Sequence, residues 1–186
     1  MRRDVDMAGV RRRVTTEGLV RFVMGAAACL VLGYYAFVRN EPVPLLRVID
    51  VGSHELGRFI ALPLPKTFDL MAGSIAQVLV PAGFAAYFLF AARDRLGFAL
   101  CLAWASTSCQ NVAAYIADAP YRSLQPLTGE QHEWAIVLSR LHATDFAATY
   151  SQIITAAAAL LLLVAIGTCL ATPLLAARRR SLIFSH

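Results

Sequence analysis

The sequence predicts an all-α integral membrane protein, a four-helix membrane bundle with an additional short helix at its outer face. Of the 186 residues, 58% are hydrophobic and 16% are charged, whereas soluble domains carry roughly a quarter charged residues. Four long runs contain no charged side chain, at residues 22–38, 70–92, 96–117 and 146–177. Arginine clusters precede the first run and follow the last, as they do at the cytoplasmic ends of membrane proteins.

These patterns divide the chain into three parts. Residues 1–17 form a basic N-terminal segment, residues 18–177 a transmembrane domain, and residues 178–186 a basic tail. Even the shortest run, at residues 22–38, reaches roughly 25 Å as a helix and so nearly spans the hydrocarbon. We interpret it as an uncleaved anchor rather than a signal peptide, because no small-residue cleavage site follows. Both termini are expected in the cytoplasm of a bacterium, with the protein in its inner membrane.

The composition also argues against other classes of protein. The net charge of +5 comes with basic flanks on apolar spans, so nucleic-acid binding is not predicted. The four cysteines lie inside apolar runs without a C-x-x-C pair, which predicts neither a disulfide framework nor a thiolate metal site. No histidine lies within an uncharged run, which argues against a membrane-embedded haem.

The segment from residue 45 to residue 62 differs from the four runs. Two proline pairs bracket it, and ionisable residues interrupt its apolar pattern. Such a segment is too charged to face lipid on all sides, so it is expected to be an interfacial helix or a re-entrant helix buried against protein. Its ionisable residues are Arg47, Asp50, His54, Glu55 and Arg58.

The string His54-Glu55-Leu56-Gly57-Arg58 resembles part of a zinc-protease helix. That helix reads H-E-x-x-H, in which two histidines on one face bind the metal and the glutamate activates water. Here Arg58 takes the place of the second histidine, and a guanidinium cannot ligate zinc. The alternative is a charge ladder, because Asp50, His54 and Arg58 share one helical face and Glu55 can reach Arg58.

Other polar residues are expected near the same membrane face. His132, His142, Asp118 and Asp145 flank the last two runs on the outer side, where ionisable groups often mark function. A solvated loop and a favourable helix dipole are the simpler explanations for His132 and Asp145. Within the bundle, a polar interior is expected from Gln77, Asn111 and Tyr115, and hydrogen bonding between helices is its simplest role.

The chain resembles a group of small bacterial multi-pass membrane proteins across residues 49–150. The resemblance is carried by four strings in order, which are His54 to Arg58, Gly73-Ser74 with Gln77 and Pro81, Asn111 through Tyr115 to Asp118-Ala119, and His132-Glu133-Trp134. That group is distantly similar to site-2-type intramembrane zinc proteases. No second membrane-embedded aspartate-glycine string, as those proteases have, follows in this chain.

The resemblance implies a zinc site near the outer membrane surface. It makes His54 a ligand and Glu55 the catalytic base, with His132, Asp118 and Asp145 as further candidate ligands. Because Arg58 brings a positive charge onto the ligand face, we expect a degenerate, non-proteolytic site in which Arg58 stands in for the cation. Two alternatives remain open, an accessory subunit of a larger membrane complex and an active metal-dependent hydrolase that uses His54, His132 and an aspartate.

The predicted orientation can be tested with topology reporters. Tags fused at residues 1 and 186 should both report the cytoplasm, and a reporter inserted at Gly129 should report the periplasm, because the arginine clusters hold both chain ends inside. Paired alkaline phosphatase and fluorescent protein fusions at these sites make the measurement. A cytoplasmic signal at Gly129 would overturn the orientation.

Overall fold

The structure, a computed structural model, describes residues 7–124 and 132–183, with side chains from 18 to 124 and from 132 to 175. All regular elements in these ranges are helical, which confirms the all-α prediction for this part of the chain. They are α1 (Met7–Gly33), the π-helix η1 (Tyr34–Arg39), α2 (Pro44–Ala61), α3 (Lys66–Phe90), α4 (Arg95–Ala117), α5 (Glu133–Arg140), the 3-10 helix η2 (Thr144–Phe146) and α6 (Ala147–Ile183). The reporter position Gly129 lies outside the described residues.

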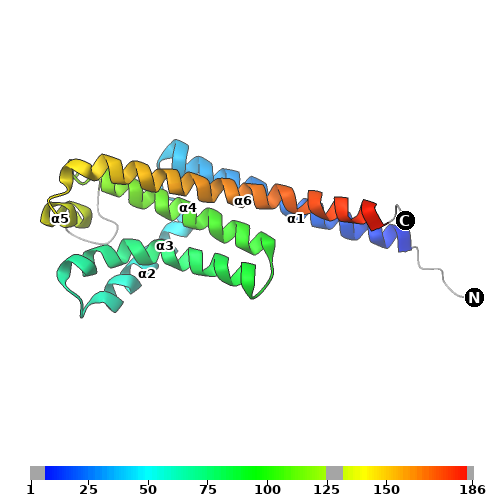
Figure 1. Cartoon of the computed structure of the whole chain (residues 1–186), viewed down its shortest axis with the longest axis horizontal. Helices are drawn as coiled ribbons and strands as arrows, with labels where there is room; N and C mark the ends of the chain where they lie inside the picture. The colour runs from blue at the N-terminus through cyan, green and yellow to red at the C-terminus, as the bar shows by residue number, and fades with distance from the viewer. Residues whose placement is uncertain (1–6, 125–131, 184–186) are drawn as a thin grey trace, which may run out of the picture.

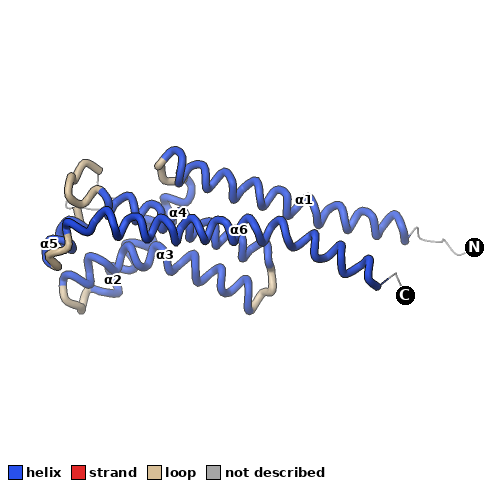
Figure 2. Tube along the Cα trace, turned by 45° about the horizontal axis from the view of Figure 1, so that its top comes forward, coloured by secondary structure: helices blue, strands red, loops and turns tan. Residues whose placement is uncertain are grey.

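Four long helices, α1, α3, α4 and α6, run along the length of an elongated bundle (Figures 1 and 2). The first turn of α1 and the last turn of α6 lie at one end, and the turn between α3 and α4 points the same way. Helix α5 lies at the opposite end, where α3 begins and α4 finishes. Helix α4 is the central element, because it packs against α6, α3 and α1.

Three stretches are long and apolar enough to cross a membrane, Gly18–Arg39, Lys66–Phe90 and Thr144–Leu175. They correspond to the first, second and fourth of the predicted spans. Their apolar side chains remain largely exposed, including Met24 at 65%, Leu79 at 62% and Leu163 at 66%. Large apolar side chains exposed along several neighbouring helices are typical of a surface that lipid covers.

The third predicted span corresponds to α4, which does not reach the hydropathy of the other three. Its central turns carry hydroxyl groups, and its packed positions are mostly small. The buried small residues of this helix include Ala99, Ala103, Ala105, Ser106, Ser108 and Ala113. Small residues let helices approach closely, and hydroxyls hydrogen-bond between them, as the Ser106 hydroxyl does to the Ala158 carbonyl oxygen of α6 at 2.6 Å. The polarity of α4 therefore matches its central position.

Helix α2 buries its polar face and exposes its apolar face, which is the reverse of a surface helix in water. Its polar residues Asp50, Ser53 and His54 are buried, while its large apolar residues are exposed. The most exposed are Leu45, Val48, Phe59 and Ile60, at 67–78%. A helix in water buries its apolar face, so this inversion indicates an apolar environment around α2. The predicted short helix is confirmed, with proline at its first position and Pro63 beyond its end.

Helix α2 begins part-way along the bundle and not at its end. Asn40, just before it, accepts a hydrogen bond from Gln110 of α4 at 3.5 Å, and Gln110 lies roughly 10 Å from the last residue of α4 at 1.5 Å per residue. From there α2 runs beside α3 toward the end that holds α5 (Figure 1). It therefore lies along the bundle instead of across the end that holds α5.

Two glycines allow α2 and α3 to pack closely. A Cβ on Gly57 would collide with the backbone carbonyl oxygen of Ala72 and with the Ala76 side chain. A Cβ on Gly73 would collide with the imidazole of His54. The absence of side chains at these two positions thus places the polar face of α2 directly against α3.

Two substitutions in α2 test this packing. Gly57→Ala should lower stability by about 1–3 kcal/mol, because the new methyl group meets backbone that cannot move away. Gly52→Ala is the matched control, since a Cβ there meets nothing within 4 Å and alanine favours the helix. Thermal unfolding in detergent micelles provides the measurement. Equal unfolding temperatures for the two variants would argue against the close contact.

Candidate functional site

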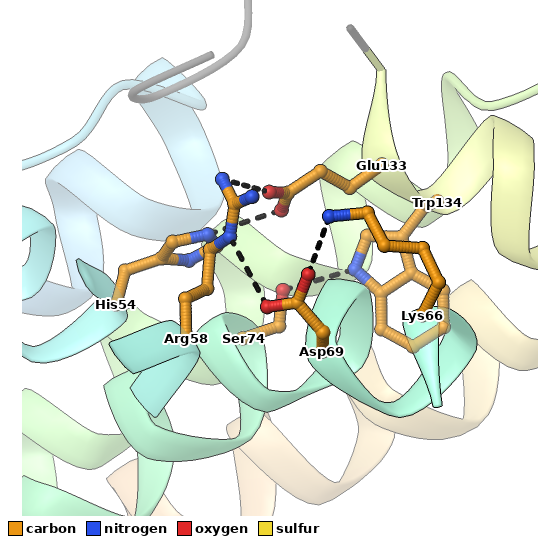
Figure 3. Close-up of polar contacts among 7 residues, drawn as sticks. All are labelled: His54, Arg58, Lys66, Asp69, Ser74, Glu133 and Trp134. Carbon is orange, nitrogen blue, oxygen red and sulfur yellow. Dashed lines mark hydrogen bonds and ion pairs between the residues drawn. The ribbon is translucent and has the colours of Figure 1, made fainter. Parts of the chain in front are cut away.

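An ion-pair cluster joins α2, α3 and α5 near one end of the bundle (Figure 3). We define it as His54, Arg58, Lys66, Asp69 and Glu133. Glu133 lies 3.0 Å from His54 Nε2 through Oε2 and 3.0 Å from Arg58 Nη1 through Oε1. Asp69 lies 3.8 Å from Arg58 Nε and 2.6 Å from Lys66 Nζ. Arg58 therefore bridges two carboxylates that come from different helices.

Local sequence positions each member of the cluster. His54 and Arg58 are four residues apart and so project from the same face of α2. Asp69 and Glu133 lie in the first turns of α3 and α5, where the helix dipole favours a negative charge. The indole of Trp134 donates a hydrogen bond to Ser74 Oγ of α3 at 3.0 Å, which fixes the first turn of α5 beside α3.

The cluster is largely removed from solvent. His54, Asp69 and Glu133 are buried, and the side chain of Arg58 is 26% exposed. A carboxylate only accepts hydrogen bonds, so His54 carries a proton on Nε2, and this N–H donates a hydrogen bond to Glu133. In a neutral imidazole the other nitrogen, Nδ1, is then an acceptor, and it is buried without a hydrogen-bond partner among the described residues.

The residues of the cluster do not fit a zinc ion. Zinc takes about four nitrogen, oxygen or sulfur ligands, with water as one of them in catalytic sites. No group of three His, Cys, Asp or Glu side chains suited to a metal occurs among the side chains described, at residues 18–124 and 132–175. The guanidinium of Arg58 contacts Glu133, the carboxylate next to His54, so a divalent cation there would meet a fixed positive charge.

A second polar group, which we call the Asp118 group, closes the end of α4. Asp118 accepts hydrogen bonds from the Leu124 backbone N–H at 2.7 Å, from the Ser123 backbone N–H at 3.2 Å and from the Ser123 hydroxyl. His132 Nε2 lies 3.2 Å from Asp118 Oδ2. The rings of His132 and Tyr115 stack with centroids 4.0 Å apart. These contacts join the turn after α4 to the start of α5.

Both ring nitrogens of His132 are used by the fold. Nδ1 accepts the backbone N–H of Ala135 at 3.2 Å and so caps α5. Nε2 must then carry the proton that it donates to Asp118. His54 thus contacts Glu133 and His132 contacts Asp118. This arrangement does not favour a shared metal site built from His54, His132 and an aspartate.

The electrostatics of the Asp118 group keep Asp118 charged and His132 neutral. Burial opposes the charge of Asp118, but the hydrogen bonds from Ser123 and Leu124, together with His132, outweigh it and lower the pKa of Asp118 below its usual value. Burial is the largest influence on His132 and lowers its pKa, although Asp118 pulls in the opposite direction.

A third polar contact lies deeper in the bundle, between α2 and α4. Asp50 Oδ1 accepts hydrogen bonds from Trp104 Nε1 at 2.8 Å and from the Ser108 hydroxyl at 3.1 Å. Gln77 of α3 lies beside Asp50 and is almost fully buried. Its amide makes no hydrogen bond among the described residues.

The structure brings some of the predicted site residues together and separates others. Asp50, His54 and Arg58 share a face of α2, as predicted, but Asp50 bonds to α4 and does not pair with Arg58. Glu55, the predicted catalytic base, is exposed because one residue further along a helix points about 100° away from His54. The expected contact between Glu55 and Arg58 is not formed, since Arg58 pairs with Glu133 and Asp69.

The remaining predicted residues fall into two groups. Gln77 and Tyr115 are buried, and Asn111 is half-buried with no hydrogen bond to Gln77. Asp145 and His142 are exposed and join neither cluster. Sequence reasoning gave no role to Asp69, Lys66 or Trp104. The position of Asp69 in the first turn of α3 was a signal that could have pointed to it.

Comparisons with known protein families, with curated proteins and with solved structures found no match. What the arrangement offers chemically is an arginine between two buried carboxylates, a histidine with one free ring nitrogen, and a separate neutral histidine that caps a helix.

The lowered pKa of His132 predicts a specific dependence of stability on pH. The unfolded chain protonates this imidazole near pH 6.5, while the folded chain resists protonation. The contribution of His132 is therefore fully present above about pH 6.5 and is lost as pH falls toward the folded pKa. The unfolding temperature of the wild type in micelles should fall between pH 7 and pH 5.

His132→Asn should reduce this decline, because asparagine retains an acceptor for capping α5 but does not titrate. His142→Asn is the control, since His142 is exposed and has a positive φ of 52° that asparagine tolerates. It should leave the pH profile unchanged. A profile that His132→Asn leaves as steep as that of the wild type would contradict the assignment.

Proposed function

We propose that this chain is a polytopic inner-membrane protein with a metalloprotease-like polar site at its outer face that is non-proteolytic because Arg58 replaces the metal. In this proposal α4 also crosses the membrane, central and shielded by the three apolar spans, and α2 is a re-entrant helix. The polar inner face and apolar outer face of α2 support its immersion in lipid.

The position of Arg58 carries the proposal. Its guanidinium contacts Glu133 of α5 and Asp69 of α3, beside the imidazole of His54. In a helix that reads H-E-x-x-H, the residue at this position would be the second metal-ligating histidine. The positive charge that a metal would supply to the two carboxylates is here supplied by the protein itself.

The exposure of Glu55 supports the same conclusion. A general base must lie within hydrogen-bond reach of the water that it activates. Glu55 is exposed on α2, whereas His54 and Arg58 are directed toward α3 and α5. The carboxylate that does contact His54 is Glu133, and it is engaged by Arg58.

An accessory subunit of a larger membrane complex is the second candidate, and the outer face of α2 favours it. Helix α2 packs mainly on α3, and its other side presents a row of large apolar residues. Such a face suits a helix of another subunit as well as it suits lipid. Copurification of a stable partner without metal would favour this candidate.

Replacing the arginine by histidine tests the proposal. Arg58→His should bind about one zinc ion per chain, because it rebuilds two histidines four residues apart beside Glu133 and Asp69. The wild type should bind far less zinc at the same free concentration. Elemental analysis of the purified protein after equilibrium dialysis against zinc makes the comparison.

Arg58→Gln is the matched control, since it removes the positive charge without supplying a ligand. It should stay near the wild-type zinc content, and Glu55→Gln in the Arg58→His background should not reduce binding, because Glu55 is exposed. If folded Arg58→His takes up no more zinc than Arg58→Gln does, the resemblance to a metalloprotease is superficial and the proposal fails.

A further inference from the structure

An apolar groove lies between α3, α4, α5 and α6. Its volume is about 390 Å³. Nine residues line it, namely Met71, Ile116, Trp134, Leu138, Leu141, Ala143, Tyr150, Ile153 and Ile154. Leu141, Tyr150 and Ile153 are exposed, so the groove opens to the outside of the bundle.

The polar groups of the groove wall are already engaged or lie at its rim. The indole N–H of Trp134 is bonded to Ser74, so the wall offers its apolar ring surface. Arg140 is next to Leu141, and its Nη1 donates to Thr67 Oγ1 at 3.3 Å. Thr67 is one helical turn before Met71, which places the guanidinium at one end of the groove.

Arg140 has charge to offer a ligand. It is exposed and forms no ion pair among the described residues, in contrast to nearby Lys66, which pairs with Asp69. A guanidinium binds phosphate oxygens well. The groove therefore combines an apolar wall with a cationic end. These features are complementary to a phospholipid, which joins an apolar chain to an anionic phosphate.

We propose that this groove binds one phospholipid molecule, with an acyl chain along Trp134, Leu138 and Ile154 and with its phosphate on Arg140. Methylene groups of the chain would pack against apolar side chains that four helices supply to the groove wall. The site rests on the membrane location of the protein and is independent of Arg58, so the zinc experiment and the lipid experiment can fail separately.

Trp134 makes the site measurable, because bromine on an acyl chain quenches an indole that it touches. The protein in nonionic detergent micelles is titrated with a phospholipid that carries brominated chains. The Trp134→Phe variant retains only Trp104, the second tryptophan. Its quenching curve is subtracted from that of the wild type to leave the quenching of Trp134. Quenching of Trp134 should saturate at a low mole fraction of lipid. Brominated diacylglycerol, which lacks the phosphate, should reach half-saturation only at about a tenfold higher mole fraction, because it cannot bond to Arg140.

Variants at the cationic end complete the test. Arg140→Gln should raise the half-saturating mole fraction about tenfold, as expected for loss of a charged hydrogen bond, and Arg140→Lys should stay close to the wild type. Arg47→Gln, an exposed arginine of α2 outside the groove, should change nothing. Quenching of wild-type Trp134 that rises in proportion to bulk lipid, or equal curves for phospholipid and diacylglycerol, overturns the site even if Arg140→Gln fails to fold.

Discussion

The ion pair between Arg58 and Glu133 is the contact on which the end of the bundle that holds α5 depends. It joins α2 to α5, and through Asp69 the same guanidinium reaches α3. Helix α5 has only eight residues, too few to be stable alone. It stays in place because Glu133 and Trp134 attach its first turn to α2 and α3, while His132 caps that turn.

This pair is better understood as a determinant of geometry than as a source of stability. Burying two charges costs most of what their attraction returns, so a buried ion pair often adds little to folding free energy. Removing one partner is far more costly, because the other charge is left buried without compensation. Arg58 thus specifies how α2 packs against α5, since any packing that separates them would leave Glu133 without Arg58 and His54, whereas Asp69 would keep Lys66 of its own helix.

The sequence could predict what depends on local pattern. The apolar runs predict the long helices, and the charges within residues 45–62 predict a helix that cannot face lipid on all sides. The inward face of Asp50, His54 and Arg58 followed from helical spacing. Glu133 and Asp69 could not be assigned to Arg58, because their contact depends on how α5 and α3 pack. The H-E-x-x-H pattern predicts a catalytic role for Glu55, but the close packing at Gly57 and Gly73 sets the rotation of α2 and turns Glu55 outward.

The same packing explains why α4 lacks the hydropathy of a membrane span and yet occupies the centre of the bundle. Neighbouring helices accept hydrogen bonds from its hydroxyl and indole groups, with Ser106 bonded to Ala158 of α6 and with Trp104 and Ser108 bonded to Asp50 of α2. Lipid would leave these groups without partners. The polar residues of α4 and those of α2 therefore depend on each other, because each helix supplies hydrogen-bond partners for polar groups that the other buries inside an apolar surface.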